Sequence, residues 1–270
     1  MKNSFSFALK LVFSREKGSF SRFASLLSIG GLSIGVTALL LTVSIVQGFQ
    51  DVISFKLSSL EGNARVKHIL SKPINTNDRI FSSFLKEITP ENSSAYVRDI
   101  SLIRKGRIVD GIIMEGSTHI PEFIKKYDSN MILDNEIIIG RILAQNLKVK
   151  VGDKVFVQSL KIKNSPRIKS LLIRDIFHSG LQDFDKSMTY TNLATAQNIF
   201  EMDSNQVSGY IFNNVKPNEF INNIGYPLIY EDWKSRHSLL FEWIKLQRWP
   251  AYIMFGLITL VGIVNLIASL

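Results

Sequence analysis

The sequence predicts an α+β domain inserted between two transmembrane α-helices. Two segments, residues 23–50 and 249–270, contain no charged residue, and each is long enough to cross a bilayer. The residues between them switch repeatedly between strand and helix patterns and carry charges throughout. An apolar helix at each end of a mixed domain is therefore the architecture that we expect.

Length, charge and composition narrow the class of protein. The chain has 270 residues, 46% of them hydrophobic, and a formal net charge of +9. A positive balance alone would suit a nucleic-acid binder, but the two uncharged segments suit a bilayer, so we expect membrane lipid and no nucleic acid as a partner. The chain contains no cysteine, which excludes disulfides, thiolate metal sites and cysteine nucleophiles.

The first apolar segment, residues 23–46, is predicted to be a transmembrane helix. At about 1.5 Å rise per residue it covers the hydrocarbon layer of roughly 30 Å, and it avoids the penalty of about 3 kcal/mol that a charged residue would carry there. A secretory signal peptide would have a shorter apolar region and a small-residue cleavage site. Because the segment continues into Gln47-Gly48-Phe49, we interpret it as an uncleaved anchor.

The second apolar segment, residues 249–270, opens with Trp249 and Pro250. Tryptophan favours the membrane interface, and proline at a first-turn position loses no helical hydrogen bond. The sequence stops inside this segment, without the basic flank with which a spanning helix usually leaves the bilayer. We therefore expect that the chain is truncated here and that further membrane segments or a cytoplasmic domain follow.

The charges before the first apolar segment predict the orientation of the chain. The charged residues among 1–22 are basic except Glu16, which places this segment in the cytoplasm by the positive-inside rule. The apolar spacing of the segment suits a short interfacial helix. Residues 47–248 then form the domain on the other side of the membrane. The basic residues concerned are Lys2, Lys10, Arg15, Lys17 and Arg22.

The middle region is predicted to begin and end with stalk helices. Apolar spacing continues the first helix outward as far as Gly62, and residues 232–247 form a second stalk that leads into the second span. Between the stalks we expect strands and short helices in one lobe or two. The predicted strands are 65–71, 95–104, 107–115, 136–140, 151–160, 168–177, 188–191, 206–212 and 228–230, and the predicted helices are 77–88, 141–147, 193–200 and 218–224.

Motifs for nucleotide or metal chemistry do not occur in the sequence. Neither a G-x-x-x-x-G-K-[ST] loop nor a G-x-G-x-x-G fingerprint is found, so any ATP hydrolysis must come from a separate chain. The histidines stand singly, without the i, i+4 pair that presents two metal ligands on one helix face. No catalytic residue, cofactor or metal is therefore predicted. The histidines are His68, His119, His178 and His237.

One polar cluster admits a catalytic interpretation. His178 is followed by Ser179 and lies close in sequence to Asp183 and Asp185. Catalytic triads are recognised by geometry, which adjacency in sequence does not supply. We favour a polar loop after a strand at this position.

Small and polar residues in the apolar segments predict helix packing. Gly31 and Gly35 form a G-x-x-x-G motif, which lets another helix backbone approach closely. Asn265 lies deep in the second segment, where its amide requires a hydrogen-bond partner, either on another helix or in the local backbone. We expect all three residues to face other helices.

Six segments follow, in order along the chain, the pattern of a known family. They are SIGGLSIGVTALLLTVSIVQGFQ (28–50), EIIIGRILAQNLKVKVGDKV (136–155), SGLQDFDKS (179–187), SNQVSGY (204–210), LFEWIKLQ (240–247) and GIVNLIASL (262–270). In these segments the chain resembles the FtsX/MacB-type permeases of ABC transporters, closest to the lipoprotein-releasing LolC/LolE family. The resemblance covers the N-terminal part of such a permease, including a MacB-like periplasmic core domain.

The resemblance implies a subunit of the bacterial inner membrane with a cytoplasmic N-terminus and with residues 47–248 in the periplasm. Such permeases have four helices, pair with a second permease copy or a paralogue, and contain no ATPase of their own. A cytoplasmic ABC ATPase drives movements of the periplasmic domains, a mechanism called mechanotransmission. In the lipoprotein-releasing branch this work extracts lipoproteins from the inner membrane and passes them to a periplasmic carrier.

The resemblance also implies that the carrier docks on a protruding hairpin. The corresponding hairpin, residues 160–170, is only a short turn around Pro166 in this chain. It could contact acidic partners or anionic head groups, or it could be a solvated edge hairpin protected by its charges. The basic residues that flank the turn are Lys161, Lys163, Arg167 and Lys169.

Two other classes of protein share parts of this pattern. A membrane receptor with an extracytoplasmic sensing domain also has two spans around a domain of this size. The segments that follow Leu270 would distinguish the two, because a permease continues with further spans and a receptor with a signalling region. An anchored hydrolase that uses His178 ranks third, since no nucleophile and base are recognisable as a set.

Overall fold

A computed structural model of the chain describes residues 20–78, 93–118, 124, 132–160, 167–212, 224–246 and 248–269. Of residues 20–28, 248 and 265–269 it describes the backbone alone. The chain divides into two compact units. The first comprises the chain up to Ile53 together with the residues from His237 onward, and the second comprises Ser54–Arg236.

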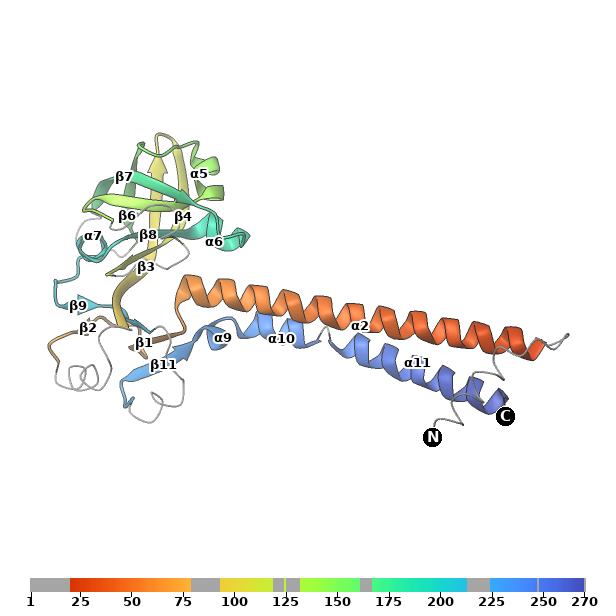
Figure 1. Ribbon diagram of the computed structural model, residues 1–270. Coiled ribbons are helices and arrows are strands. Elements are labelled where there is room, and N and C mark those ends of the chain that lie inside the picture. Colours follow the sequence, from red (N-terminus) through yellow and green to blue (C-terminus); the bar gives the residue numbers. More distant parts are fainter. Residues whose placement is uncertain are drawn as a thin grey trace. The chain divides into compact units, whose positions relative to one another are not determined.

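Two long helices dominate the first unit (Figure 1). Helix α2, Phe20–Glu61, has 42 residues, and helix α11, Arg248–Ser269, has 22. A shorter helix, α10, Ser238–Leu246, precedes α11. Two helical stretches, Ile29–Glu61 and Ser238–Val264, are long and apolar enough to span a membrane, judged by length and composition alone.

Helix α2 is continuous from the first apolar segment through the predicted stalk. Its last two turns belong to the second unit, where Leu57 and Leu60 are buried. Gly62 follows with φ 75°, the left-handed conformation that glycine adopts readily just after a helix. The prediction that the first stalk ends at Gly62 is therefore confirmed.

The second unit is built on two sheets and several short helices. The strands of the large sheet are β1 Ala64–His68, β3 Ser93–Lys105, β4 Ile108–Ser117, β5 Glu136–Gly140, β6 Lys154–Ser159, β7 Ile168–Phe177, β8 Met188–Asn192, β10 Gly209–Phe212 and β11 Leu228–Asp232. The small sheet pairs β2, Ile74–Asn75, with β9, Gln206–Val207. The helices are α5 Arg141–Leu147, α6 Gln182–Ser187, α7 Leu193–Ile199 and α9 Trp233–Arg236.

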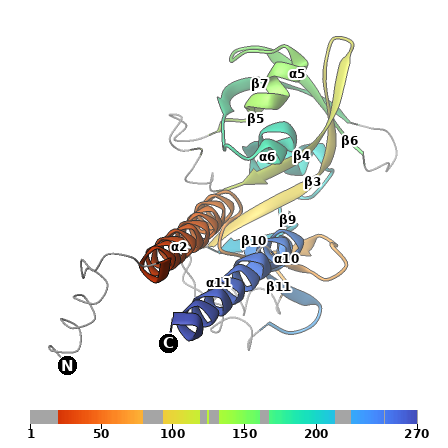
Figure 2. The ribbon, with the colours of Figure 1, turned by 90° about the vertical axis from the view of Figure 1, so that its right-hand side faces the viewer.

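The large sheet closes on itself over part of its width. Its strand order is β11-β1-β10-β3-β4-β8-β5-β7-β6, and β6 also pairs with β3. Strands β3, β4, β8, β5, β7 and β6 therefore form a barrel, from which β10, β1 and β11 continue as an open wing. Figure 2 shows the long β3–β4 hairpin of this barrel, with α5 and α6 beside it.

Each part of the sheet has its own apolar core. The barrel core is lined by buried side chains that include Val97, Ile103, Met114, Ile137 and Leu171. The wing core contains Ala64, Val66, Phe212 and Leu228. Both cores lie within the one compact second unit, and Leu193 packs against both of them.

Several predicted elements have the predicted bounds. Strand β5 and helix α5 cover residues 136–140 and 141–147. The hairpin of β3 and β4 turns at Gly106, whose φ of 59° is the left-handed conformation that a tight turn requires. The turn before β6 is held by Asp153, whose Oδ2 accepts a hydrogen bond from the Lys150 N–H at 2.8 Å.

Three predictions are wrong in detail. The predicted strand 206–212 is interrupted at Ser208, so β9 pairs with β2 while β10 pairs with β1 and β3. The predicted second stalk, 232–247, is not one helix, because Asp232 ends β11 and its Oδ1 accepts from the Ser235 N–H at 2.6 Å, and the helix breaks again at His237. The polar loop predicted after β7 contains helix α6.

Some predictions lie outside the described residues. These are most of the helix predicted over 77–88, the helix predicted over 218–224 except Ile224, and the tip of the hairpin around Pro166.

Candidate functional site

The most distinctive site is a cluster of five charged side chains that lies wholly within the second unit. It forms where the chain enters this unit at the end of α2 and where it leaves at α9. Glu61, Arg65 and Glu115 are buried, and Arg98 and Arg236 are partly buried. Buried charged residues are rare unless they are paired. The cluster consists of Glu61 at the end of α2, Arg65 in β1, Arg98 in β3, Glu115 in β4 and Arg236 at the end of α9.

Arg65 and Glu115 form the centre of the cluster. Arg65 Nη1 lies 2.7 Å from Glu115 Oε2, and Nη2 donates to Oε1 at 3.2 Å. Their side chains are 3% and 1% exposed. Burial by itself lowers the pKa of Arg65, but the nearby carboxylates, Glu115 foremost, outweigh burial and raise the pKa above its ordinary value. This two-point contact is therefore a buried bidentate ion pair.

Glu61 connects the centre of the cluster to α9. Its Oε2 lies 2.9 Å from Nε of Arg236, and its Oε1 lies 3.4 Å from Nη2 of Arg98. Its backbone carbonyl also accepts a hydrogen bond from Arg65 Nε at 3.1 Å. Arg98 reaches the second carboxylate as well, with Nη1 3.5 Å from Oε2 of Glu115. The last residue of α2 thus contacts three different arginines.

Two tyrosines complete the surroundings of the cluster. The guanidinium of Arg65 lies 4.6 Å from the ring centre of Tyr96, a cation–π contact. Burial, followed by the charge of Glu115, raises the pKa of Tyr190 far above its ordinary value, so this phenol stays neutral. Within the described part of the chain its hydroxyl has no hydrogen-bond partner.

This arrangement suits mechanical anchoring, because the charged side chains of the cluster pair with one another. Removing Arg65 or Glu115 would leave the other one buried without its main partner, which makes the centre of the cluster difficult to open. The sequence analysis did not identify this cluster. The available signal was a charged residue inside each apolar strand pattern, Arg65 beside Val66 and Glu115 beside Met114.

A second polar cluster surrounds Asp185, which is buried in α6. Its Oδ1 accepts hydrogen bonds at 2.7 Å from both the N–H and the hydroxyl of Ser179, and its Oδ2 lies 2.5 Å from Nδ1 of His178. Asp183, in contrast, is exposed. Because Ser179 and His178 both contact the aspartate and the structure gives no hydrogen bond between them, the imidazole is not placed to activate the serine.

The Asp185 cluster holds a turn against α2. Gly180 has φ 74°, and a Cβ added to it would be 2.5 Å from Nζ at the end of the Lys56 side chain of α2. The chain favours glycine here for its backbone conformation, because the lysine side chain can move aside. This turn is a second contact between the end of α2 and the barrel.

The predicted helix-packing residues lie on α2 and α11 in the first unit. A Cβ on Gly35 would lie 3.1 Å from Cδ1 of Ile258, so Gly35 lets α11 approach α2 closely. A Cβ on Gly31 would have no described atom within 4 Å. The side chain of Asn265 lies outside the described residues.

The same two helices enclose an apolar groove in the first unit. Its volume is about 420 Å³. Carbon-rich side chains make up most of its wall, with the polar groups of Thr42, Gln47 and Tyr252 as the exceptions. The lining residues are Leu39, Thr42, Val43, Val46, Gln47, Ala251, Tyr252 and Phe255.

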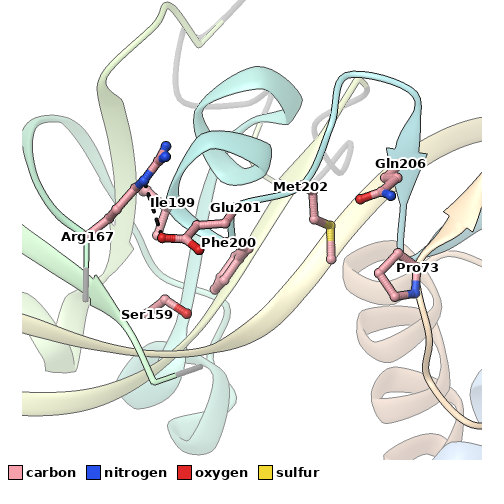
Figure 3. Close-up of a pocket in the computed structure, with 8 residues that line it drawn as sticks. All are labelled: Pro73, Ser159, Arg167, Ile199, Phe200, Glu201, Met202 and Gln206. Atoms are coloured by element: carbon pink, nitrogen blue, oxygen red, sulfur yellow. Dashed lines mark ion pairs between the residues drawn. The ribbon is translucent and has the colours of Figure 1, made fainter. Parts of the chain in front are cut away.

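Of the predicted partner-contact hairpin, Arg167 and Lys169 lie within the described residues, whereas Lys161, Lys163 and Pro166 do not. Lys169 Nζ lies 3.5 Å from Oδ1 of Asn135. Arg167 borders a pocket of about 180 Å³ and forms an ion pair with Glu201 across its edge, with Nε 3.3 Å from Oε1 (Figure 3). Phe200, Met202 and Pro73 supply apolar parts of its wall.

Comparison with known proteins places the chain in a family. The sequence profile of the MacB-like periplasmic core domain matches residues 25–222, which is most of the chain. The chain belongs to the MacB-like periplasmic core domain family. The resemblance to FtsX/MacB-type permeases, stated above from six sequence segments, is thereby confirmed.

Relatives of this MacB-like chain include lipoprotein-releasing system transmembrane proteins LolC. The LolC of Xylella fastidiosa strain Temecula1 is 24% identical over 290 residues, an alignment that covers 100% of this chain and 70% of the relative. The LolC of Neisseria meningitidis serogroup B is 24% identical over 287 residues, an alignment that covers 97% of this chain and 68% of the relative. The crystal structure of the periplasmic region of MacB from Actinobacillus actinomycetemcomitans is 6% identical, with a TM-score of 0.42 over 68% of this chain and 95% of that structure.

Proposed function

We propose that the chain is a permease subunit of an ABC transporter that releases lipoproteins from the bacterial inner membrane. Membership of the MacB-like family and relatives named LolC support this function. The structural observation that carries it is the continuity of α2, a single helix that begins in the apolar segment and ends in the buried ion cluster. A helix anchored in this way can transmit a displacement to a folded domain.

In the proposed topology, α2 and α11 cross the membrane and residues 1–22 lie in the cytoplasm. Residues 47–248 then lie in the periplasm, and the two spans are residues 23–46 and 249–270. A separate cytoplasmic ATPase moves the helices, and a second permease copy or a paralogue completes the assembly. The chain itself is not an enzyme, and it needs no cofactor for this role.

The proposed coupling depends on how firmly α2 is held. Leu57 and Leu60 fix its outer end by apolar burial, and Glu61 fixes it by charge. The Gly180 turn adds a contact to the barrel beside Lys56. Because protein interiors are close-packed, a shift of this helix end cannot be absorbed locally and must move the strands that hold it. This is mechanotransmission in physical terms.

The apolar groove between α2 and α11 is the proposed contact for the acyl part of the cargo. Its volume falls within the range of about 300–1,000 Å³ that is typical of ligand pockets, and its wall is mainly apolar. The basic hairpin, with Lys161, Lys163, Pro166, Arg167 and Lys169, is the proposed contact for a periplasmic carrier. The helix-packing residues Gly31, Gly35 and Asn265 are proposed to face other helices of the assembly.

A two-span receptor with an extracytoplasmic sensing domain is the alternative. Cysteine labelling tests the proposed topology, and depletion of the chain distinguishes the two functions. Since the chain has no cysteine, a single cysteine at Lys10 or at the exposed Arg107 gives an unambiguous topology probe. A membrane-impermeant maleimide should label the Arg107 variant alone in intact spheroplasts. Labelling of the Lys10 variant alone would contradict the proposed orientation.

Depletion of the chain tests the proposed cargo. In cells in which its gene is under inducible control, depletion should cause lipoproteins destined for the outer membrane to accumulate in the inner membrane, as measured by membrane fractionation. The chain should also co-purify with an ABC ATPase. Normal lipoprotein sorting after full depletion would rule out the proposed function, and a co-purifying histidine kinase would favour the receptor.

A further inference from the structure

We propose that Arg236 is a releasable latch that holds α9 to the end of α2, and that Arg98 is the alternative cation that takes over Glu61 when Arg236 leaves. This role rests on the proposed function, because it describes how one of the two connections to the periplasmic domain can move. In the latched state α9 is tied to α2 through Glu61. In the released state α2 keeps its anchor while α9 is free to reorient.

The two connections are anchored very differently. The end of α2 buries Leu57, Leu60 and Glu61, so withdrawing it would expose apolar surface and a charge. Helix α9 has only four residues, none of them buried, and the helix breaks immediately after it at His237. The one large apolar side chain of α9, Trp233, is only partly buried, so release of α9 exposes less apolar surface than release of α2, which would disrupt a core.

The contacts of Arg236 are poorer than those of Arg65. Its Nε lies 2.9 Å from Oε2 of Glu61 but is not aligned for a hydrogen bond, and its Nη2 reaches the Glu61 carbonyl at 3.4 Å. Its Nη1 is buried and has no hydrogen-bond partner among the described residues. Arg65, in contrast, makes two aligned hydrogen bonds to Glu115.

The cluster contains three arginines for two carboxylates. Arg98 lies between the carboxylates, 3.4 Å from Glu61 and 3.5 Å from Glu115, at the long end of ion-pair distances. Its side chain is 23% exposed, so it can shift without leaving a cavity. When Arg236 leaves, Arg98 can move closer to Glu61, and Glu115 keeps its two bonds to Arg65. Neither carboxylate is then left as an unpaired buried charge, which would be the main obstacle to opening.

The electrostatic environment supports the same assignment. Burial, followed by the positive charge of Arg65, lowers the pKa of Arg236 to about 10, with Arg98 contributing in the same direction and Glu61 opposing. The pKa of Arg65 is raised instead. The site therefore disfavours the charged form of Arg236 and favours that of Arg65, as expected if Arg236 is the member that leaves.

Substitutions at Arg236 and Arg98 should have opposite effects on α9. The assembled permease, in lipid nanodiscs, carries one nitroxide label on a cysteine at the exposed position Lys234 of α9 or at Phe55 of α2. Arg236→Ala should increase the ratio of mobile to immobile label at position 234 by about tenfold. Breaking an exposed ion pair would have a smaller effect, and breaking a fully buried ion pair would have a larger one. Arg98→Met should decrease this ratio below that of the wild type, because Arg98 then no longer competes with Arg236 for the Glu61 carboxylate.

A matched control is available on the neighbouring strands. Lys67 and Glu231 form an ion pair with the same 2.9 Å separation between β1 and β11, but their side chains are 30% and 26% exposed. Lys67→Ala should leave the label at position 234 unchanged. The mobility of the label at position 55 should be the same in every variant as in the wild type.

Two outcomes would overturn the latch. If Arg98→Met mobilises the label at position 234 as Arg236→Ala does, the cluster is a static anchor. If either variant also mobilises the label at position 55, α9 is not released independently of α2. These readouts need neither ATP nor cargo, so they remain valid if lipoprotein release proves not to be the function. Conversely, the labels could respond as expected while lipoprotein sorting stays unimpaired in depleted cells. This result would reject the proposed function in lipoprotein release but not the latch.

Discussion

Glu61 and Arg236 lie 175 residues apart in the sequence, yet their side chains approach to 2.9 Å. One is the last residue of α2, and the other is the last residue of α9. The two points at which the chain enters and leaves the second unit therefore share one ion pair. Both connections are tied to the same three strands through Arg65, Arg98 and Glu115.

Removing one partner of the Arg65–Glu115 pair should destabilise the protein much more than removing both. Arg65→Met leaves Glu115 buried without its main partner and should destabilise the protein by about 3–5 kcal/mol. The double variant Arg65→Met/Glu115→Leu removes both charges and should recover most of this loss. Chemical denaturation of the detergent-solubilised chain measures both effects, and a double variant as unstable as the single one would contradict the explanation.

Asp185 should stabilise the turn that contacts α2. Asp185→Ala leaves the N–H and the hydroxyl of Ser179 without their acceptor and should cost about 1–3 kcal/mol. Asp183→Ala, in the same first turn of α6 but exposed, is the matched control and should change stability little. Thermal unfolding measures the stability of both variants. If both lose the same stability, the negative charge in the first turn of α6 is the cause, and the buried hydrogen-bond acceptor is not.

The two glycines of the G-x-x-x-G motif should behave differently. Gly35→Leu should separate α2 from α11, because even a Cβ at this position lies 3.1 Å from Ile258. A Cβ at Gly31 has no described atom within 4 Å, so the effect of Gly31→Leu should appear mainly in co-purification with the second permease copy. Cysteine cross-linking between α2 and α11 measures the first effect. Unaltered cross-linking in Gly35→Leu would exclude close packing there.

Filling the groove between α2 and α11 should impair the proposed cargo contact without affecting assembly. Ala251→Trp places a large ring in a groove of about 420 Å³. The control is Leu257→Trp, on the same helix at an exposed position that does not line the groove. We expect inner-membrane retention of lipoproteins in the first variant only. Retention in both would indicate a general defect of α11.

The turn before β6 should make stability depend on pH. The hydrogen bond from the Lys150 N–H and that from Lys105 lower the pKa of Asp153 below its ordinary value of about 3.9. A lowered carboxyl pKa gives stability that is present above about pH 4 and is lost as the pH falls through the folded-state pKa. Asp153→Asn should therefore lower the melting temperature at pH 7 and have a smaller effect at pH 3. An equal effect at both pH values would rule out the charged form as the cause.

Elements with strong local signals were predictable. Strand β5, helix α5 and the turn at Gly106 depend on patterns a few residues long, and the structure has them where the sequence predicts them. The second stalk was not predictable as it stands, because the apolar stripe over 232–247 continues across two breaks. The first break arises from the partners that β11 finds in β1 and from the capping contact of Asp232 with Ser235.

By itself the sequence determined the two apolar helices, the mixed domain between them and the family, because hydropathy and periodicity are properties of neighbouring residues. Only the tertiary structure decided that Glu61, Arg65, Arg98, Glu115 and Arg236 form one cluster. These residues come from five elements, and nothing in their local sequence specifies their mutual distances. The sheet order brings β1, β3 and β4 together, and the cost of burying a lone charge then requires the five side chains to meet.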